Sequence, residues 1–215
     1  MIGIIGAMPE EIDGLLGAFD SEAKVTAVFG STFYSGSING KDIVVAKSGI
    51  GKVNAAFVAT LLGTRFGASK IVMTGIAGGI KCNTLDAVVA TGFVHHDVSM
   101  VDEEDGHLDI LDTIVIPADE ELSKIISDEK SVRGIIATGE AFIADKRLGD
   151  YIVRRFPGVV AVDMECGAVA QVCTRMGVPF AAIKVISDGC DGEVYLDLAV
   201  RAAEMGVAAV LKLFT

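Results

Sequence analysis

The feature that most constrains the fold is an alternation of short, apolar, β-rich runs with helical runs along the chain. The run IGIIGA (residues 2–7) precedes a helix that we expect from about Pro9, DIVVAKS precedes KVNAAFVATLLGTRF, and SKIVMTG precedes a glycine turn. The pattern ends with the helical run DLAVRAAEMGVAAVLKLF, residues 197–214. Because such alternation is typical of α/β proteins, the sequence predicts an α/β fold.

The middle of the chain continues this pattern without a break. Strands are expected in DAVVATGFV, VRGIIATG, GVVAVD and PFAAIKVISD, and helices near ADEELSKIISDE, around KRLGDYIVRRF and after residue 163. A left-handed cap is expected at Gly177, directly after the last of these helices. No repeat, low-complexity stretch or linker rich in Pro, Gly and Ser divides the sequence. We therefore predict that residues 1–215 form a single domain.

The charge balance argues against polyanionic partners. The formal net charge is -11 and the sequence pI is about 4.6, so phosphate backbones and anionic lipid surfaces would be repelled. Hydrophobic residues make up 51% of the chain and the mean hydropathy is +0.53, as expected for a compact globule. With no leader-like or membrane-spanning run in the sequence, we expect a cytoplasmic protein that binds a small molecule, not nucleic acid or membrane.

The cysteines and histidines give little support to a metal site. Cys82, Cys166, Cys173 and Cys190 form no CxxC pair and are interpreted as reduced thiols, with Cys166 and Cys173 on one face of a helix. A zinc cluster of His95, His96, Asp97 and His107 is disfavoured because adjacent residues of a strand point to opposite faces. We expect neither a metal nor a cofactor.

Three nucleotide- or cation-binding motifs are incomplete. GIIGAM lacks the G-x-G-x-x-G pattern of a dinucleotide-binding turn. In AKSGIGKV, Ala46 replaces the first glycine of a phosphate-binding loop and Val53 replaces its Ser or Thr. VDEEDGHLDILD resembles a calcium loop, but Val101 and Asp112 stand at its first and last ligand positions, where other residues are expected.

Three carboxylates follow apolar strands, where open α/β sheets place their ligands. Glu11 follows IGIIGAMPE, Glu165 follows VVAVDM and Asp188 follows FAAIKVIS. Each alone could cap a helix or remain solvated, and a turn or capping role is enough to explain Asp163. Together the three acids suit cleavage of a purine N-glycosidic bond, which needs an acid for the base, a base for water and an anion near the cationic ribose.

Six segments resemble 5′-methylthioadenosine/S-adenosylhomocysteine nucleosidases of the nucleoside phosphorylase superfamily. They are IGIIGAMPEEI, KSGIGKVNAA, TGIAGG, TGEAFI, VDMECGAVA and VISD, which occur in the family's order between residues 2 and 188. The resemblance implies a single α/β domain with a central mixed, twisted sheet surrounded by helices. It also implies a homodimer that hydrolyses a purine nucleoside in methionine salvage.

The resemblance also assigns roles to the acids and their neighbours. Glu11 would activate the attacking water, and Asp188 would donate a proton to purine N7 while Ser187 positions it. Glu165 would bind the ribose hydroxyls and support the developing cation, with Met164 packed against the sugar. These roles need no nucleophilic carboxylate.

The same resemblance also indicates which residues would bind the adenine and the ribose. Phe142 and Ile143 match the adenine pocket, Phe142 by stacking and Ile143 by backbone hydrogen bonds. Met8 and Ile50 match apolar wall positions near the ribose and its 5′ substituent. The remaining candidate binding residues, from TGIAGG, are Ile76 and Gly78.

Three departures from the family pattern bear on the 5′ specificity. Ile76 replaces a serine that is often found there, and Lys184 stands where an arginine is common, which keeps the charge but loses the bidentate fork. Ungapped counting puts Asp197 and Leu198 in place of a Ser-Phe pair whose aromatic ring covers the nucleoside. All three acids are intact.

Three alternatives remain open. A nucleoside phosphorylase would need cationic phosphate anchors, whereas Glu10, Glu11 and Met73 occupy the corresponding regions. A sister nucleosidase, such as one that acts on futalosine, would accept a larger 5′ substituent. A sensor on the same fold would bind a purine nucleoside without cleaving it.

Overall fold

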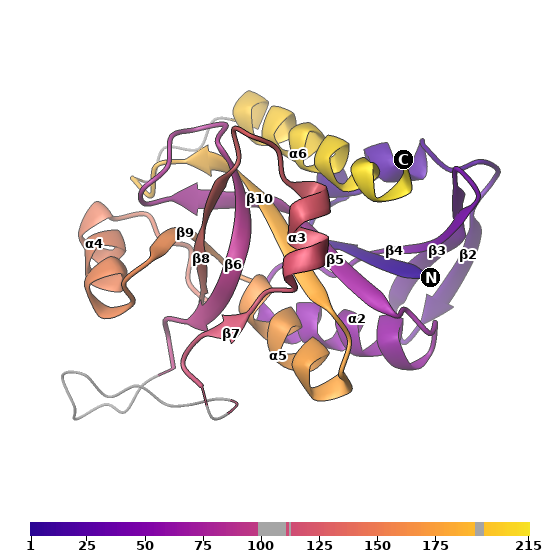
Figure 1. Ribbon diagram of the computed structural model, residues 1–215, viewed down its shortest axis with the longest axis horizontal. Helices are drawn as coiled ribbons and strands as arrows, with labels where there is room; N and C mark the ends of the chain where they lie inside the picture. Colours follow the sequence, from indigo (N-terminus) through magenta and orange to yellow (C-terminus); the bar gives the residue numbers. More distant parts are fainter. Residues whose placement is uncertain (99–110, 112, 192–195) are drawn as a thin grey trace.

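Strands and helices alternate along residues 1–98, 111, 113–191 and 196–215, which the computed structural model describes (Figure 1). The strands are β1 (Ile2–Gly6), β2 (Lys24–Val28), β3 (Ser31–Ile38), β4 (Lys41–Lys47), β5 (Lys70–Gly79), β6 (Ala87–His95), β7 (Ile116–Pro117), β8 (Val132–Thr138), β9 (Val159–Asp163) and β10 (Phe180–Asp188). The α-helices are α1 (Asp13–Leu16), α2 (Lys52–Thr64), α3 (Glu120–Ile126), α4 (Lys146–Arg155), α5 (Cys166–Met176) and α6 (Leu196–Leu211), with 3₁₀ turns η1 (Pro9–Glu11) and η2 (Lys212–Phe214).

The described strands form one mixed sheet. Its order is β10-β6-β8-β9-β5-β1-β4-β3-β2, with β7 beside β6. Strand β10 pairs with β6 along one edge and with β5 along the other, so β5, β10, β6, β8 and β9 close into a ring. The predicted α/β fold with a mixed sheet is confirmed, and the ring closure was not predicted.

Helices cover both faces of the sheet, as Figure 1 shows. Ile5 and Val44 belong to the apolar core beneath α2 and α5, whereas Ile4 and Val45 belong to the core beneath α6. Neighbouring residues of a strand point to opposite faces, so both must be apolar when both faces are covered. This double burial explains why these strands read as continuous apolar runs.

The N-terminal part of the sheet is an antiparallel meander that the sequence analysis missed. The turn between β2 and β3 has positive φ angles at Phe29 and Gly30, and the turn between β3 and β4 has them at Asn39 and Gly40. Two successive positive φ angles match the twist of a two-residue hairpin. The Asn-Gly pair is a strong hairpin signal, so the second turn was predictable.

The glycine turn expected after SKIVMTG was wrong, because β5 continues through TGIAGG to Gly79. A Cβ on Gly75, whose φ is +148°, would clash with the carboxylate of Glu11. A Cβ on Gly78 would lie 2.7 Å from Cys190 Sγ. These glycines therefore let neighbouring segments approach the strand closely instead of turning it.

Two other local predictions concern the ends of helices. Gly177 caps α5 in the left-handed conformation, with φ 66° and ψ 28°, as predicted. The helix expected from about Pro9 starts there as the short turn η1, and α1 follows it. None of the helices in the described part of the chain combines the length and apolarity that a membrane crossing requires.

Candidate active site

A cavity of about 190 Å³ lies where the carboxyl ends of β1, β9 and β10 meet the glycine-rich end of β5. Ten of the eleven candidate residues line it: Met8, Glu11, Ile50, Ile76, Gly78, Phe142, Met164, Glu165, Ser187 and Asp188. Ile143 lies in a smaller adjoining cavity that also touches Phe142 and Met164. The structure thus brings together residues from six separate segments of the sequence.

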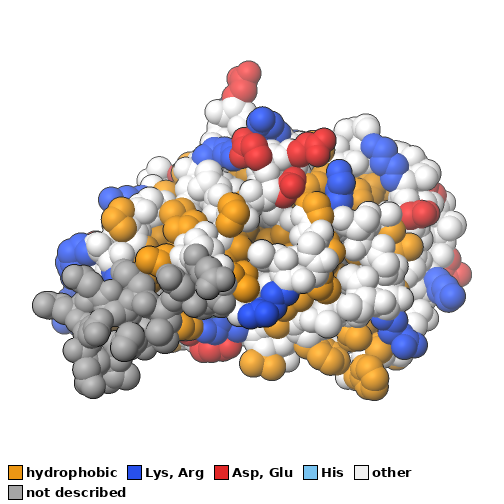
Figure 2. All heavy atoms as spheres, turned by 60° about the horizontal axis from the view of Figure 1, so that its bottom comes forward, with side chains coloured by type: hydrophobic (Ala, Val, Ile, Leu, Met, Phe, Trp, Pro, Cys, Tyr) orange, Lys and Arg blue, Asp and Glu red, His pale blue; other side chains and the backbone are white. Residues whose placement is uncertain are grey.

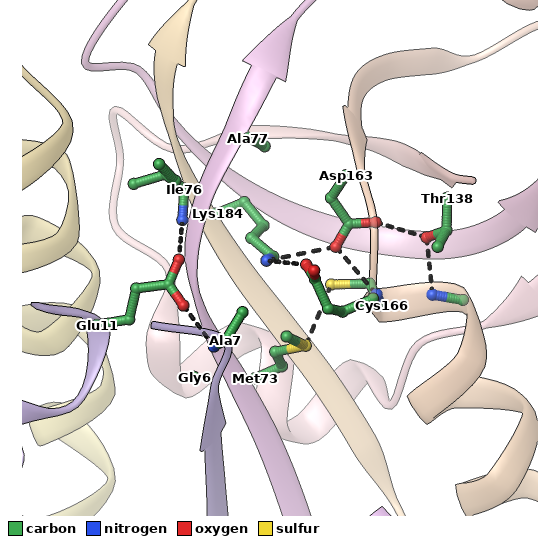
Figure 3. A network of polar contacts seen from close by, with 12 residues as sticks. Gly6, Ala7, Glu11, Met73, Ile76, Ala77, Thr138, Asp163, Cys166 and Lys184 are labelled. Atoms are coloured by element: carbon green, nitrogen blue, oxygen red, sulfur yellow. Dashed lines mark hydrogen bonds and ion pairs between the residues drawn. The ribbon is translucent and has the colours of Figure 1, made fainter. Parts of the chain in front are cut away.

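The carboxylate of Glu11 is buried and held by backbone N–H groups from the bend after β1 and from strand β5. Its Oε2 accepts hydrogen bonds from the N–H groups of Ala7 and Met8, the latter at 3.0 Å. Its Oε1 accepts one from Ile76 N at 2.9 Å (Figure 3). A carboxylate has about four acceptor positions, so these three bonds leave one position on Oε1. Glu11 is therefore fixed in orientation, but it can still accept a hydrogen bond from a group in the cavity.

Asp188 is the last residue of β10 and is also buried. Its Oδ2 accepts a hydrogen bond from Ser187 Oγ at 2.9 Å, and its Oδ1 accepts one from Cys190 N at 3.0 Å. Gly78 makes room for this arrangement, since a Cβ there would lie 3.3 Å from Asp188 Oδ1. The neighbouring serine thus orients the carboxyl group.

Glu165 lies at the turn between β9 and α5 and is paired with two donors. Its Oε1 accepts a hydrogen bond from Gly51 N at 3.0 Å, and its Oε2 lies 3.4 Å from Lys184 Nζ. Burial raises the pKa of Glu165, while the Lys184 ammonium and the Gly51 N–H oppose this rise. Two acceptor positions remain free for a ligand.

Lys184 is fully buried between two carboxylates, a pairing that the sequence did not reveal (Figure 3). Its Nζ lies 3.3 Å from Asp163 Oδ2 as well as 3.4 Å from Glu165 Oε2. Burial alone would lower the pKa of this ammonium, but the surrounding anionic groups raise it well above its ordinary value. The lysine therefore supplies a fixed positive charge behind the cavity.

Asp163 caps the first turn of α5, as the sequence led us to expect, and it makes further contacts with Thr138 and Lys184. Its Oδ2 accepts a hydrogen bond from Cys166 N, the first N–H of α5, at 2.9 Å. Its Oδ1 accepts one from Thr138 Oγ1, which in turn accepts from Gly167 N (Figure 3). Asp163 also lines the cavity and pairs with Lys184. It thus fixes the lysine that faces Glu165.

The remaining walls are apolar and partly open. Phe142 and Ile50 stand at the mouth, with 54% and 53% of their surface exposed. Three small lining residues escaped the sequence analysis: Ala7, Ala77 and Val162. Small apolar residues carry no chemical signal of their own, so only the resemblance to known motifs next to them could have pointed to them.

The loop rejected as a phosphate site has another function in this geometry. Gly51, in AKSGIGKV, has a φ of +98° and donates its N–H to Glu165. Helix N-termini attract anions because their N–H groups lack partners within the helix. Here the anion is a side chain of the protein itself.

Among the residues that the structure describes, no three His, Cys, Asp or Glu side chains are grouped so that they could hold a metal ion. His107 and all of the calcium-like segment 101–112 except Leu111 lie outside the described residues. Leu198 lies in the first turn of α6 and is not among the described lining residues.

Comparisons with known proteins agree with this geometry. The family model of the phosphorylase superfamily matches residues 1–215. A 5′-methylthioadenosine/S-adenosylhomocysteine nucleosidase of Anoxybacillus flavithermus is 39% identical over 87% of this chain and 84% of its own length. The one from Psychromonas ingrahamii is 37% identical over 98% of this chain and 97% of its own length.

Solved structures with the same fold include two kinds of nucleosidase. The Streptococcus pneumoniae 5′-methylthioadenosine/S-adenosylhomocysteine nucleosidase, bound to a transition-state inhibitor, has a TM-score of 0.91 at 29% identity and covers 99% of this chain and 97% of its own. Futalosine hydrolase of Helicobacter pylori has a TM-score of 0.91 at 30% identity, and the match covers 98% of this chain and 95% of the hydrolase. The chain therefore belongs to the phosphorylase superfamily and, within it, to the 5′-methylthioadenosine/S-adenosylhomocysteine nucleosidase family.

Proposed function

We propose that this protein hydrolyses the N-glycosidic bond of 5′-methylthioadenosine, S-adenosylhomocysteine or both, and releases adenine and the corresponding thioribose. The observation that carries the proposal is the convergence of Glu11, Glu165 and Asp188 on one cavity, each buried and each held by its own donors. Burying three carboxylates in one place is costly unless each is hydrogen-bonded or paired, and here backbone N–H groups, a hydroxyl and an ammonium supply those partners. The full-length match to nucleosidases supports the same activity.

Asp188 is proposed as the acid that protonates the leaving base. As the bond between N9 and C1′ breaks, its electron pair passes into the purine, and a proton delivered to N7 makes adenine a neutral leaving group. The Ser187 hydroxyl and the Cys190 N–H hold the carboxyl group in one orientation. A fixed acid contributes to the rate because its proton is already placed for transfer.

Glu11 is proposed as the base that removes a proton from the attacking water. Three backbone N–H groups fix its orientation and leave one acceptor position for that water. The oxygen of the water forms the new bond to C1′ as its proton passes to Glu11. The result is thioribose with a hydroxyl group at C1′.

Glu165 is proposed as the group that binds the ribose hydroxyls and stabilises the cationic ring. Its two free acceptor positions match two hydroxyl donors. Positive charge on the ribose develops only in the transition state, so an anion there stabilises the transition state more than the substrate. Lys184, on the far side of the carboxylate, favours its ionised form.

Water is favoured over phosphate as the nucleophile. None of the described residues that line the cavity is an Arg or a Lys, and Glu11 would repel a phosphate dianion. The test is adenine release from 5′-methylthioadenosine in phosphate-free buffer, where we expect full turnover. Dependence on added phosphate would refute hydrolysis, and tight binding without adenine release would identify a sensor.

A sister activity on futalosine has one observation in its favour. The resemblance implies an aromatic residue over the nucleoside where this chain has Leu198, and futalosine hydrolase shares the fold at a TM-score of 0.91. Comparing kcat/KM for 5′-methylthioadenosine, S-adenosylhomocysteine and futalosine separates the activities. We expect the first two to be preferred, because the related nucleosidases of Anoxybacillus flavithermus and Psychromonas ingrahamii are named for these two substrates.

We further propose a cytoplasmic homodimer. Four exposed apolar side chains on and beside α2 would form its interface: Phe29, Ile50, Val53 and Phe57. Val53 and Phe57 share one face of α2, Ile50 lies just before the helix, and the ring centroids of Phe29 and Phe57 are 6.4 Å apart. Figure 2 shows hydrophobic side chains gathered on the face that it brings forward. Exposed patches of this kind mark association surfaces.

A further inference from the structure

Three segments that lie far apart in the sequence meet in a closed polar ring beside the cavity. Lys52 Nζ, at the start of α2, donates to Oδ1 and Oδ2 of Asp97 at 2.7 and 2.8 Å. Asp97 Oδ2 accepts a hydrogen bond from Glu140 N at 2.9 Å. Glu140 Oε1 accepts one from Lys52 N at 3.0 Å, which closes the ring. The ring joins α2 to the segments that follow β6 and β8.

This ring differs from the exposed ion pairs of the molecule. The side chains of Lys52 and Asp97 are only 18% and 29% exposed, whereas Lys124 and Glu120 in α3 are 70% and 58% exposed. Burial tends to raise the pKa of Asp97, but hydrogen bonds from Lys52 and from Glu140 N–H lower it below its ordinary value. The Lys52–Asp97 pair is therefore partly shielded from water, where ion pairs are stronger, whereas Glu140 at the other side of the ring is exposed.

The ring is continuous with Glu165 through the backbone of α2. The N–H of Lys52 is bound to Glu140, and the N–H immediately before it, that of Gly51, is bound to Glu165. A Cβ on Gly51 would lie 2.9 Å from Glu140 Oε2, so the ring packs directly against this glycine. Fixing Lys52 in place therefore also fixes the direction in which the Gly51 N–H points.

We propose that Lys52, Asp97 and Glu140 are positioning residues that hold the Gly51 N–H on Glu165 and so set how tightly the ribose is bound. The inference rests on the proposed function, since it concerns the same site. None of the three side chains is a described lining residue of the cavity, so they act through Glu165 and not on the substrate.

The test removes the charge of Asp97 while keeping its shape. In Asp97→Asn we expect KM for 5′-methylthioadenosine to rise about tenfold, with kcat within about threefold of wild type, as for the loss of one charged hydrogen bond in ground-state binding. Lys52→Met removes the other partner of the ion pair and serves as the second variant if Asp97→Asn folds poorly. Lys52→Arg keeps the positive charge, so its KM should stay within about threefold of wild type. Glu120→Gln, which breaks an exposed pair, is the matched control and should leave KM unchanged.

A second readout separates positioning of Glu165 from a general structural effect. The 2′,3′-dideoxy analogue of 5′-methylthioadenosine lacks the two hydroxyls that Glu165 is proposed to bind. Its inhibition constant therefore does not depend on how Glu165 is positioned. We expect Asp97→Asn to change it by less than about twofold, since the ring acts only on hydroxyl binding. Equal weakening of substrate and analogue, or an unchanged KM in both ring variants, would overturn the inference. If the wild-type protein released no adenine at all, the proposed function itself would fail.

Discussion

At the scale of single residues, the three acids of the cavity differ in what holds them. Glu11 is bound by three backbone N–H groups, Asp188 by a hydroxyl and one N–H, and Glu165 by one N–H and an ammonium. A neutral amide in place of each carboxyl group would keep its shape but lose its charge or its acidic proton. Substitutions by amides therefore test chemistry more than packing.

Asp188→Asn and Glu11→Gln should each lower kcat by about 10²–10⁴-fold, because each removes a proton-transfer group. Glu165→Gln should lower kcat and also raise KM, since the amide loses the negative charge and replaces one acceptor oxygen by an NH₂ donor. Steady-state adenine release measures both constants. Near-normal kcat in either of the first two variants would contradict the assigned roles.

Lys184→Met should destabilise the fold by about 3–5 kcal/mol, because it leaves the carboxylates of Asp163 and Glu165 buried without their cation. The pKa of Glu165, which burial already raises, should rise further and move the acidic limb of the kcat/KM profile to higher pH. Urea unfolding and a pH–rate profile measure the two effects. A variant as stable as wild type would show that the lysine is not needed to balance these charges.

At the scale of elements, Gly75 of β5 leaves the space that the carboxylate of Glu11 occupies. Gly75→Ala should remove most activity, because its Cβ would occupy the position of the Glu11 carboxylate. Gly177→Ala is the matched control, since Gly177 also has positive φ but nothing lies within 4 Å of its added Cβ. The control should lose about 1 kcal/mol from backbone strain and keep its kcat. Equal kcat values in the two variants would contradict the proposed geometry.

Two histidines at the end of β6 should make the free energy of unfolding depend on pH. Burial lowers the pKa of both His95 and His96 in the folded protein. At pH values between these lowered pKa values and the ordinary value of about 6.5, the unfolded chain therefore binds more protons than the folded one. Their contribution to stability is therefore present above about pH 6.5 and is lost as the pH falls, by up to about 1.4 kcal/mol per histidine over one pH unit. Urea unfolding at pH 7.5 and 5.5 should show a smaller difference in His95→Asn than in wild type.

The apolar runs predicted the alternation of strands and helices because both faces of the sheet are covered. The candidate residues that the resemblance named lie around one cavity, apart from Ile143, which lies in the adjoining cavity. Periodicity could not predict that β5 continues through TGIAGG, since the reason is close approach by Glu11 and Cys190. Likewise, nothing local to Lys184 identifies its partners, which are 19 and 21 residues away in the sequence.

At the scale of the whole molecule, the apolar surface of α2 is expected to bury itself against a second copy. The chain has a mass of 22.4 kDa, so light scattering of the wild-type protein should give about twice that value for a dimer. Val53→Asp, which places a charge on a residue that is 79% exposed, should yield the monomer without unfolding it. A monomeric wild-type protein would refute the proposed interface.

The closed ring of strands also bears on aggregation. Each of the five strands in the ring has partners on both edges, and β1, β3 and β4 are paired on both sides as well. Among the described strands longer than two residues, β2 is the one left with an open edge, and it carries Lys24 and a largely exposed Val25. Unpaired edges are where foreign strands can add. Within the described strands, the risk of strand-mediated self-association therefore lies at β2. Strands β5, β1, β4 and β3 separate β2 from β9, which leads into Glu165, and from β10, which ends at Asp188.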